Sequence, residues 1–135
     1  MIFSVYGQLK SIENDSCIIN VSGIGYEVNI PENIKKNLPQ IGDFIELFTY
    51  HHIREDNQQL FGFIKIEDKH IFLKLISVSG LGPKLAIKIL SEYNASELAA
   101  AIVGKNIHKL TQLPGVGKKM AERLIIELKD KLDFI

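Results

Sequence analysis

The sequence lacks the features that mark secreted and membrane proteins. It has one cysteine, Cys17, so no internal disulfide can form and a reducing, cytosolic compartment is expected. No stretch approaches the ~20 consecutive apolar residues of a membrane-spanning helix. Residues 1–6 lack the basic start and small-residue cleavage site of a secretory signal peptide. We therefore expect a cytoplasmic protein with no membrane partner.

The chain also has no net charge, which by itself argues against a nucleic-acid partner. The charges are unevenly divided, however. Residues 1–64 carry four basic and eight acidic residues, a net charge of −4, whereas residues 65–135 carry twelve basic and eight acidic residues, a net charge of +4. Attraction to a polyanion is therefore expected in the second half of the chain.

Catalytic and metal-binding patterns are missing as well. Gly117-Lys118 is followed by Lys119 instead of Ser or Thr, and no glycine lies five residues before Gly117, so there is no nucleotide-binding loop. The histidines lack Cys or His neighbours at ligand spacing, or point to opposite faces of a strand. These histidines are His51, His52, His70 and His108. No metal site and no catalytic residue is predicted, and the chain has no ATP-binding motif of its own.

What the sequence does contain is one short motif used twice. Residues 79–86 read SGLGPKLA and residues 114–121 read PGVGKKMA, at a constant offset of 35. The match extends outward, from Leu75 with Leu110 to Glu92 with Glu127. Apolar residues recur with period 3.6 on both sides of each Gly-x-Gly. The pattern predicts a duplicated unit of helix, tight turn and helix.

The glycines and cations of this unit favour binding of an anion. A tight turn between helices needs positive φ, which glycine adopts without steric cost, and bare glycine lets another backbone approach. The second helix then starts with unpaired N–H groups and the positive end of its dipole. The predicted phosphate-binding residues are Gly80, Gly82, Lys84, Gly115, Gly117, Lys118, Lys119 and Arg123. The alternative, turns that serve packing alone, leaves the repeated lysines unexplained.

The first half of the chain reads as β structure. Strands are predicted over residues 3–12 with a bend at Gly7, and over residues 17–21, 26–30, 44–53 and 59–64. A hairpin turn is predicted over residues 22–25, a short helix or turn over 31–38, and a polar loop tip over 54–57. Five short strands with one helical insertion suit a small Greek-key barrel of OB type, with an open sandwich as the competitor.

The hydrophobic period becomes helical from Glu67 onward. Asn94 and Glu97 have the spacing of a capping box, Gly104 is a predicted helix end and Asn106 a new N-cap. The last helix is predicted to run to about residue 132. The predicted fold is therefore α+β in two domains: a five-stranded OB-type barrel over residues 1–64 and an all-α tandem helix-hairpin-helix domain over residues 65–135.

These residues resemble the helix-hairpin-helix motif of DNA-binding proteins, and the chain as a whole resembles the RuvA family, the Holliday-junction-binding subunit of the bacterial branch-migration complex. The resemblance is carried by Tyr6-Gly7, Gly23-Ile24-Gly25-Tyr26, Arg54-Glu55-Asp56, Leu60-Phe61-Gly62-Phe63, both glycine turns, and Glu127-Leu128-Lys129.

This resemblance implies a homotetramer, with an octamer of two tetramers left open, that holds a four-way DNA junction open and flat during recombination and repair. It assigns minor-groove phosphate contacts to the two turns and an acidic pin to Glu55 and Asp56. It also implies a third domain that contacts the hexameric ATPase RuvB, and nothing after Ile135 can supply that domain. ATP and Mg²⁺ would be used by that motor, and a monovalent cation could bind at the hairpins. From the sequence alone, two acids on a loop are usually a solvated turn.

Three function classes compete. The leading one is a non-catalytic module that recognises DNA structure through its phosphates. The second is a helix-hairpin-helix repair enzyme, a glycosylase or nuclease, for which Glu122 is the only acid just after the second turn. The third is a single-strand binder that uses the barrel, which the acidic first half argues against.

Overall fold

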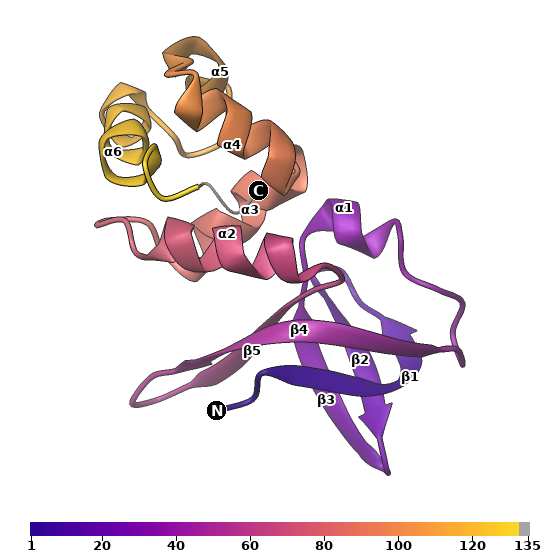
Figure 1. Ribbon diagram of the computed structural model, residues 1–135. Coiled ribbons are helices and arrows are strands. Elements are labelled where there is room, and N and C mark those ends of the chain that lie inside the picture. The colour runs from indigo at the N-terminus through magenta and orange to yellow at the C-terminus, as the bar shows by residue number, and fades with distance from the viewer. Residues whose placement is uncertain (133–135) are drawn as a thin grey trace. The chain divides into compact units, whose positions relative to one another are not determined.

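The computed structural model describes residues 1–132, and the chain divides into two compact units, residues 1–69 and 70–135 (Figure 1). The sequence-based boundary after residue 64 lies slightly earlier, because it follows the change of hydrophobic period. That change marks the start of α2 (Ile66–Ile76), and the boundary between the units falls inside this helix. Each unit is described by itself.

The first unit is a closed barrel of five strands in the order β1-β2-β3-β5-β4. All neighbouring strands are antiparallel except β3 and β5, which pair in parallel. The strands are β1 (Ser4–Ile12), β2 (Ser16–Val21), β3 (Ile24–Asn29), β4 (Phe44–Ile53) and β5 (Gln58–Phe63). The predicted five-stranded OB-type barrel is confirmed, and the open sandwich is wrong.

Apolar side chains on alternate positions of the strands fill the barrel. In β1, Val5 and Leu9 are buried whereas Tyr6 and Gln8 are exposed, as the period of a half-buried strand requires. Cys17 in β2 is fully buried, and this burial raises the pKa of its thiol to about 11. The thiol stays protonated at neutral pH, so Cys17 acts as a small apolar core residue.

The turn between β2 and β3 is shorter than the sequence pattern predicts. It consists of Ser22 and Gly23, with φ of 52° and 92°, and Ile24 and Gly25 already belong to β3. Positive φ at both positions is typical of a two-residue type I′ turn, whose twist matches that of the strands it joins. The tight turn therefore extends the β2–β3 ladder as far as the pair Val21 and Ile24.

Gly7 does not mark the bend of β1. The pairing register shifts between Leu9 and Ser11 instead, where β1 passes β2. At Gly7, a Cβ atom would lie 2.2 Å from the carbonyl oxygen of Asn20 on β2. The position therefore requires glycine because two backbones approach closely, which the sequence pattern could not distinguish from a bend.

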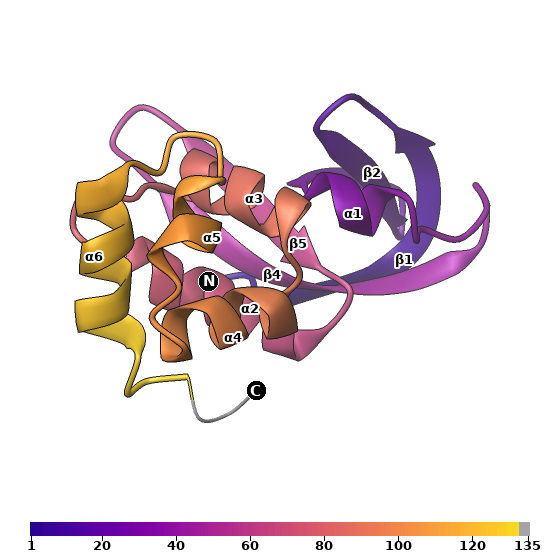
Figure 2. The same ribbon diagram turned by 90° about the horizontal axis from the view of Figure 1, so that it is seen from above.

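The second unit contains the C-terminal part of α2 and four further helices, seen from above in Figure 2. They are α3 (Pro83–Glu92), α4 (Ala95–Val103), α5 (Ile107–Thr111) and α6 (Lys118–Leu128). The positions with helical period form the core. Fully buried members of this core are Ile71, Phe72, Leu75, Ala86, Ile89, Leu98, Ile102, Leu110, Ala121, Leu124 and Leu128.

Asparagine side chains cap two of these helices. Asn94 Oδ1 accepts a hydrogen bond from the Glu97 N–H at 2.8 Å, and Glu97 Oε1 accepts one from the Asn94 N–H at 3.1 Å. This capping box at α4 is confirmed, as are the helix end at Gly104 and the N-cap at Asn106, which accepts from the Lys109 N–H at 3.0 Å. Local sequence signals therefore set the starts of α4 and α5.

Two helices are shorter than predicted. The helix α1 (Glu32–Lys35) is a single turn that covers part of residues 31–38. Ile34 is its one buried residue, so little packing stabilises a longer helix. The helix α6 ends at Leu128 instead of reaching residue 132. Leu132 is still buried, so its apolar side chain fits the helical period although the chain around it is no longer helical.

The close approach at Gly7 leads to a first prediction. Gly7→Ala should lower the free energy of unfolding by about 2 kcal/mol or more, because the added Cβ meets backbone that cannot move without breaking the ladder. Urea unfolding followed by circular dichroism measures this change. Lys10→Ala, at an exposed position on the same strand, is the control and should change stability by less than ~0.5 kcal/mol. Equal stability of the two variants would contradict the steric argument.

Candidate nucleic-acid interface

The two glycine turns have the same backbone geometry. We call residues 77–82, between α2 and α3, the first turn and residues 112–117, between α5 and α6, the second turn. The leading glycines, Gly80 and Gly115, have φ of +85° and +77°. The trailing glycines, Gly82 and Gly117, have φ of −93° and −89° with extended ψ. The duplication seen in the sequence is therefore a duplication of structure.

Positive φ is needed at only one glycine of each pair. The leading glycine adopts the left-handed conformation that side chains disfavour, as predicted. The trailing glycine does not, and it is the N-cap of the following helix. A Cβ atom at Gly82 or Gly117 would meet nothing within 4 Å, so the space beside these two residues is open.

The residue between the glycines anchors each turn. Leu81 and Val116 are both 4% exposed. The Leu81 N–H donates to the Val78 carbonyl at 3.1 Å, and the Val116 N–H donates to the Leu113 carbonyl at 3.2 Å. The apolar side chain points into the core while the flanking glycines stay at the surface, so each turn presents bare backbone outward.

The starts of α3 and α6 are left without side-chain caps. A helix leaves its first four N–H groups unpaired within the helix. Whereas asparagine side chains accept from such groups at α4 and α5, Gly82 and Gly117 have no side chain that could do so at α3 and α6. Pro83, which has no N–H to leave unpaired, takes the first position of α3. The open N–H groups and the helix dipole favour an anion at both sites.

Each turn packs against the helix that follows the other turn. The bare Cα of Gly80 faces Met120 of α6, whose Cε would lie 3.7 Å from an added Cβ. Gly115 faces Leu85 of α3, whose Cδ1 would lie 2.9 Å away. Leu85 and Met120 are equivalent positions of the repeat, so the two contacts are reciprocal. The second unit therefore brings the two uncapped helix starts together at a spacing set by core packing.

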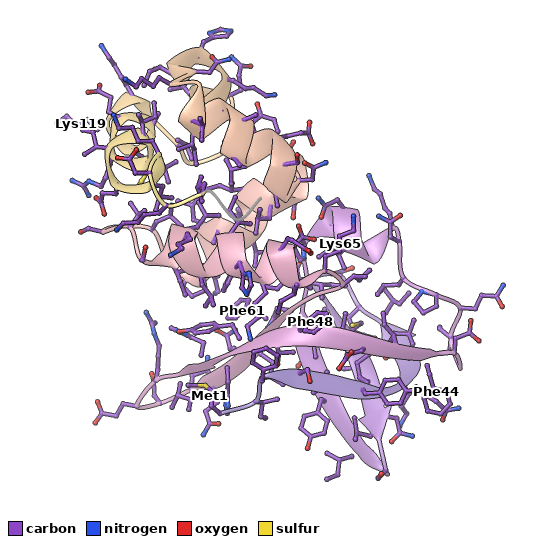
Figure 3. All side chains as sticks on the ribbon, in the orientation of Figure 1. Met1, Phe44, Phe48, Phe61, Lys65 and Lys119 are labelled. Atoms are coloured by element: carbon purple, nitrogen blue, oxygen red, sulfur yellow. The ribbon has the colours of Figure 1, made fainter. Side chains whose placement is uncertain are left out.

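Three of the predicted cations are free to meet a ligand. Lys84, Lys118 and Lys119 are exposed on the first turns of α3 and α6. Figure 3 shows Lys119 on the outside of α6, with its side chain directed away from the helical unit. These lysines lie beside the open N–H groups, because they occupy the first two helical positions after Gly117 and the second after Gly82.

The fourth cation, Arg123, is partly engaged by the protein. Its Nη1 donates to the Ser79 carbonyl at 2.9 Å, and its Nε lies 3.9 Å from Oε2 of Glu127. Sequence reasoning missed both partners. The spacing of four residues between Arg123 and Glu127 could have indicated the ion pair, but no sequence signal links Arg123 to Ser79.

The predicted pin residues lie at the tip of the β4–β5 hairpin. The tip is closed by a hydrogen bond from the Arg54 N–H to the Asn57 carbonyl at 2.7 Å, and Glu55 and Asp56 are exposed between them. Within residues 1–132, no cation forms an ion pair with either carboxylate. Both negative charges are therefore available at the surface of the barrel unit.

The barrel offers little to a single strand of nucleic acid. An open groove of about 640 Å³ runs beside β3 and β5, lined by Tyr26, Glu27, His51 and Gln58 among others. No lysine or arginine lines this groove, whereas single-strand grooves combine positive charge with stacking aromatics. Across the described residues, no group of three or more His, Cys, Asp or Glu side chains could hold a metal ion, and no helix is long and apolar enough to cross a membrane.

Two family models of known proteins match this chain, one in each unit. The family model described as RuvA N terminal domain matches residues 1–62, and the model described as SAM-like Helix-hairpin-helix tandem matches residues 72–130. The Holliday junction branch migration complex subunit RuvA of Geobacter sulfurreducens is 47% identical over 132 residues, which are 98% of this chain and 66% of the relative.

Two further relatives carry the same name. The protein of Haemophilus ducreyi is 44% identical over 135 residues, covering 100% of this chain and 67% of the relative. The protein of Dehalococcoides mccartyi is 43% identical over 132 residues, covering 98% of this chain and 68% of the relative. The chain therefore spans about two thirds of the length of the curated relatives it matches.

The difference between the two glycines of a turn is testable by stability. Gly115→Ala should lower the free energy of unfolding by about 2 kcal/mol or more, because alanine is strained at φ +77° and its Cβ would displace Leu85. Gly117→Ala is the matched variant, with ordinary φ and open space, and should cost less than ~1 kcal/mol. Urea unfolding of both variants measures this. Equal losses would contradict the assignment of roles.

Proposed function

Because this chain belongs to the RuvA family, we propose that it recognises four-way (Holliday) junctions, holds them open and planar, and supports ATP-driven branch migration by a partner motor in recombination and DNA repair. The observation that carries this proposal is the pair of uncapped helix starts, Gly82 and Gly117, flanked by exposed lysines. The relatives' name states junction branch migration for those proteins.

Each turn binds one stretch of DNA backbone through a phosphate. The unpaired N–H groups of α3 and α6 donate to phosphate oxygens, and the bare trailing glycines let the sugar–phosphate chain come close. Lys84, Lys118 and Lys119 add charge beside these donors. Such contacts carry no base information, so binding depends on DNA geometry and salt and has little sequence preference. The minor groove is the proposed side of contact.

The pin works by repulsion in a homotetramer, which we propose as the assembly on one junction, with two tetramers as the larger form. Unit charges 4 Å apart interact by ~1 kcal/mol in water and roughly 4 kcal/mol near a protein surface. Four copies of Glu55 and Asp56 around a four-fold axis would hold strands apart at the crossover. The same charges disfavour a plain duplex lying across the centre.

The motor and its cofactors belong to a partner. The resemblance assigns the contact with the hexameric ATPase RuvB to a third domain outside these 135 residues, and ATP and Mg²⁺ to that motor. A monovalent cation at the hairpin carbonyls is part of the proposal. It fits the second turn better than the first, because the Ser79 carbonyl of the first turn already accepts from the Arg123 guanidinium.

We further propose that the chain is non-catalytic and acts in the bacterial cytoplasm, at the nucleoid, where its DNA substrate lies. The repair-enzyme alternative is not favoured, because Glu122 is an exposed residue of α6, and the open hollow of about 350 Å³ that it lines is formed by residues of α6 alone. Incubation with branched and with damaged DNA should yield no cleavage product.

The junction preference is tested by a gel-shift comparison of a four-way junction with a linear duplex of matched sequence. The wild-type protein should bind the junction more tightly. Glu55→Ala combined with Asp56→Ala should raise the affinity for duplex relative to junction, because the repulsion at the centre is removed. The control is Glu13→Ala with Asp15→Ala, an exposed acidic pair elsewhere on the barrel unit. An unchanged ratio in the pin variant would remove the pin from the proposal.

Phosphate-only recognition leads to a prediction for Lys119. Lys119→Ala should weaken binding to junctions of different sequence equally and reduce the slope of log affinity against log salt by about 0.9, as expected for one lost phosphate contact. Titrations at several salt concentrations measure both quantities. Lys36→Ala removes one exposed charge from the barrel unit and should leave the slope unchanged. A loss confined to particular base sequences would argue for base readout instead.

A further inference from the structure

Arg123 joins two parts of the second unit that are far apart in sequence. The residue lies on α6, which follows the second turn, yet its Nη1 donates to the carbonyl of Ser79 in the first turn at 2.9 Å, 44 positions away. The same Nη1 would lie 3.6 Å from a Cβ at Gly80. One edge of the guanidinium is therefore set against the backbone of the first turn.

This contact breaks the symmetry of the repeat. The equivalents of Arg123 and Ser79 are Lys88 and Pro114, at the offset of 35. Lys88 is exposed, and the described residues show no hydrogen bond between it and Pro114. The apolar contacts of Leu85 and Met120 are reciprocal, but the polar contact occurs once. A repeated need for positive charge does not explain it, because Lys88 already has that charge.

The guanidinium is held on a second side by a carboxylate. Oε2 of Glu127, one helical turn further along α6, lies 3.9 Å from Nε of Arg123. The side chains of Arg123 and Glu127 are 49% and 38% exposed. The planar guanidinium offers several donors in a fixed arrangement, so it can meet a carbonyl and a carboxylate at once. A lysine ammonium has no such fork.

We propose that Arg123 is a positioning residue, which ties the first turn to α6 and so fixes the spacing between the two phosphate-binding helix starts. The inference rests on the proposed function, since it assigns Arg123 a role in that same site. The main role of Arg123 is then to orient the helix start at Gly82 relative to the helix start at Gly117. Contact with phosphate through its remaining N–H groups is secondary.

Replacing Arg123 by lysine distinguishes a positioning role from a simple phosphate contact. Lysine keeps the charge and binds phosphate as a point charge, so a phosphate contact should survive Arg123→Lys. A positioning bond to a carbonyl requires the geometry of the fork, so Arg123→Lys should behave like Arg123→Gln. Lys88→Gln is the matched control, at the equivalent position of the repeat with no bond to lose.

The first measurement is amide hydrogen exchange without DNA. The N–H groups of Leu81 and Val116 make equivalent bonds in the first and second turns. In Arg123→Lys, exchange at Leu81 should become about tenfold faster, as expected for a lost charge-assisted bond of ~1.4 kcal/mol, and exchange at Val116 should be unchanged. Faster exchange at both amides would indicate general destabilisation and overturn the proposal, as would unchanged exchange at Leu81.

The second measurement is junction affinity at a temperature where circular dichroism shows every variant folded. Arg123→Lys and Arg123→Gln should lose affinity by a similar factor, about fivefold to tenfold. Both substitutions remove the hydrogen bond to the Ser79 carbonyl, so the helix start at Gly82 is no longer held in place relative to α6. The salt slope of Arg123→Lys should equal that of the wild type. Full affinity in Arg123→Lys would overturn the proposal. Absence of junction binding by the wild type would instead contradict the proposed function, and the exchange result would still decide the role of Arg123.

Discussion

Backbone N–H groups at the start of a helix need acceptors, and the helices of the second unit differ in whether a side chain supplies one. At α4 and α5, asparagine side chains accept from the first turn of the helix. At α3 and α6, glycine stands in the same position and leaves these groups open beside empty space. Capped and uncapped helix starts occur together in this one small helical unit, so the absence of a cap is specific to α3 and α6. In the proposed function, these are the two helix starts whose acceptor is a DNA phosphate.

The two open helix starts act as a pair because the turns are packed into one core. Leu81 and Val116 anchor the turns from inside, and each leading glycine lies against the helix that follows the other turn. This packing sets the distance between the two uncapped helix starts, which in the proposed function is the distance between two bound phosphates. The bond from Arg123 to Ser79 adds a polar constraint on one side only.

In the proposed function, attraction and repulsion toward DNA come from different units of the chain. The lysines that favour phosphate lie on the helical unit, whereas the exposed carboxylates of Glu55 and Asp56 lie at a hairpin tip of the barrel unit. The chain is neutral in total because the net charge of −4 over residues 1–64 cancels the net charge of +4 over residues 65–135. A uniformly basic protein would bind any duplex, whereas in the proposed function the acidic hairpin tip gives a physical means to reject most of them.

The sequence alone determined the class of each unit, the repeat of 35 residues, the helix caps and the residues around both glycine turns. These features are local or periodic, so alternation, helical period and cap chemistry report them directly. Only the tertiary structure decided that Gly7 is required by the backbone of β2, that the leading glycines face the opposite helices, and that Arg123 reaches Ser79. Such contacts join residues far apart in the chain. They depend on strand register and core packing, which no local pattern encodes.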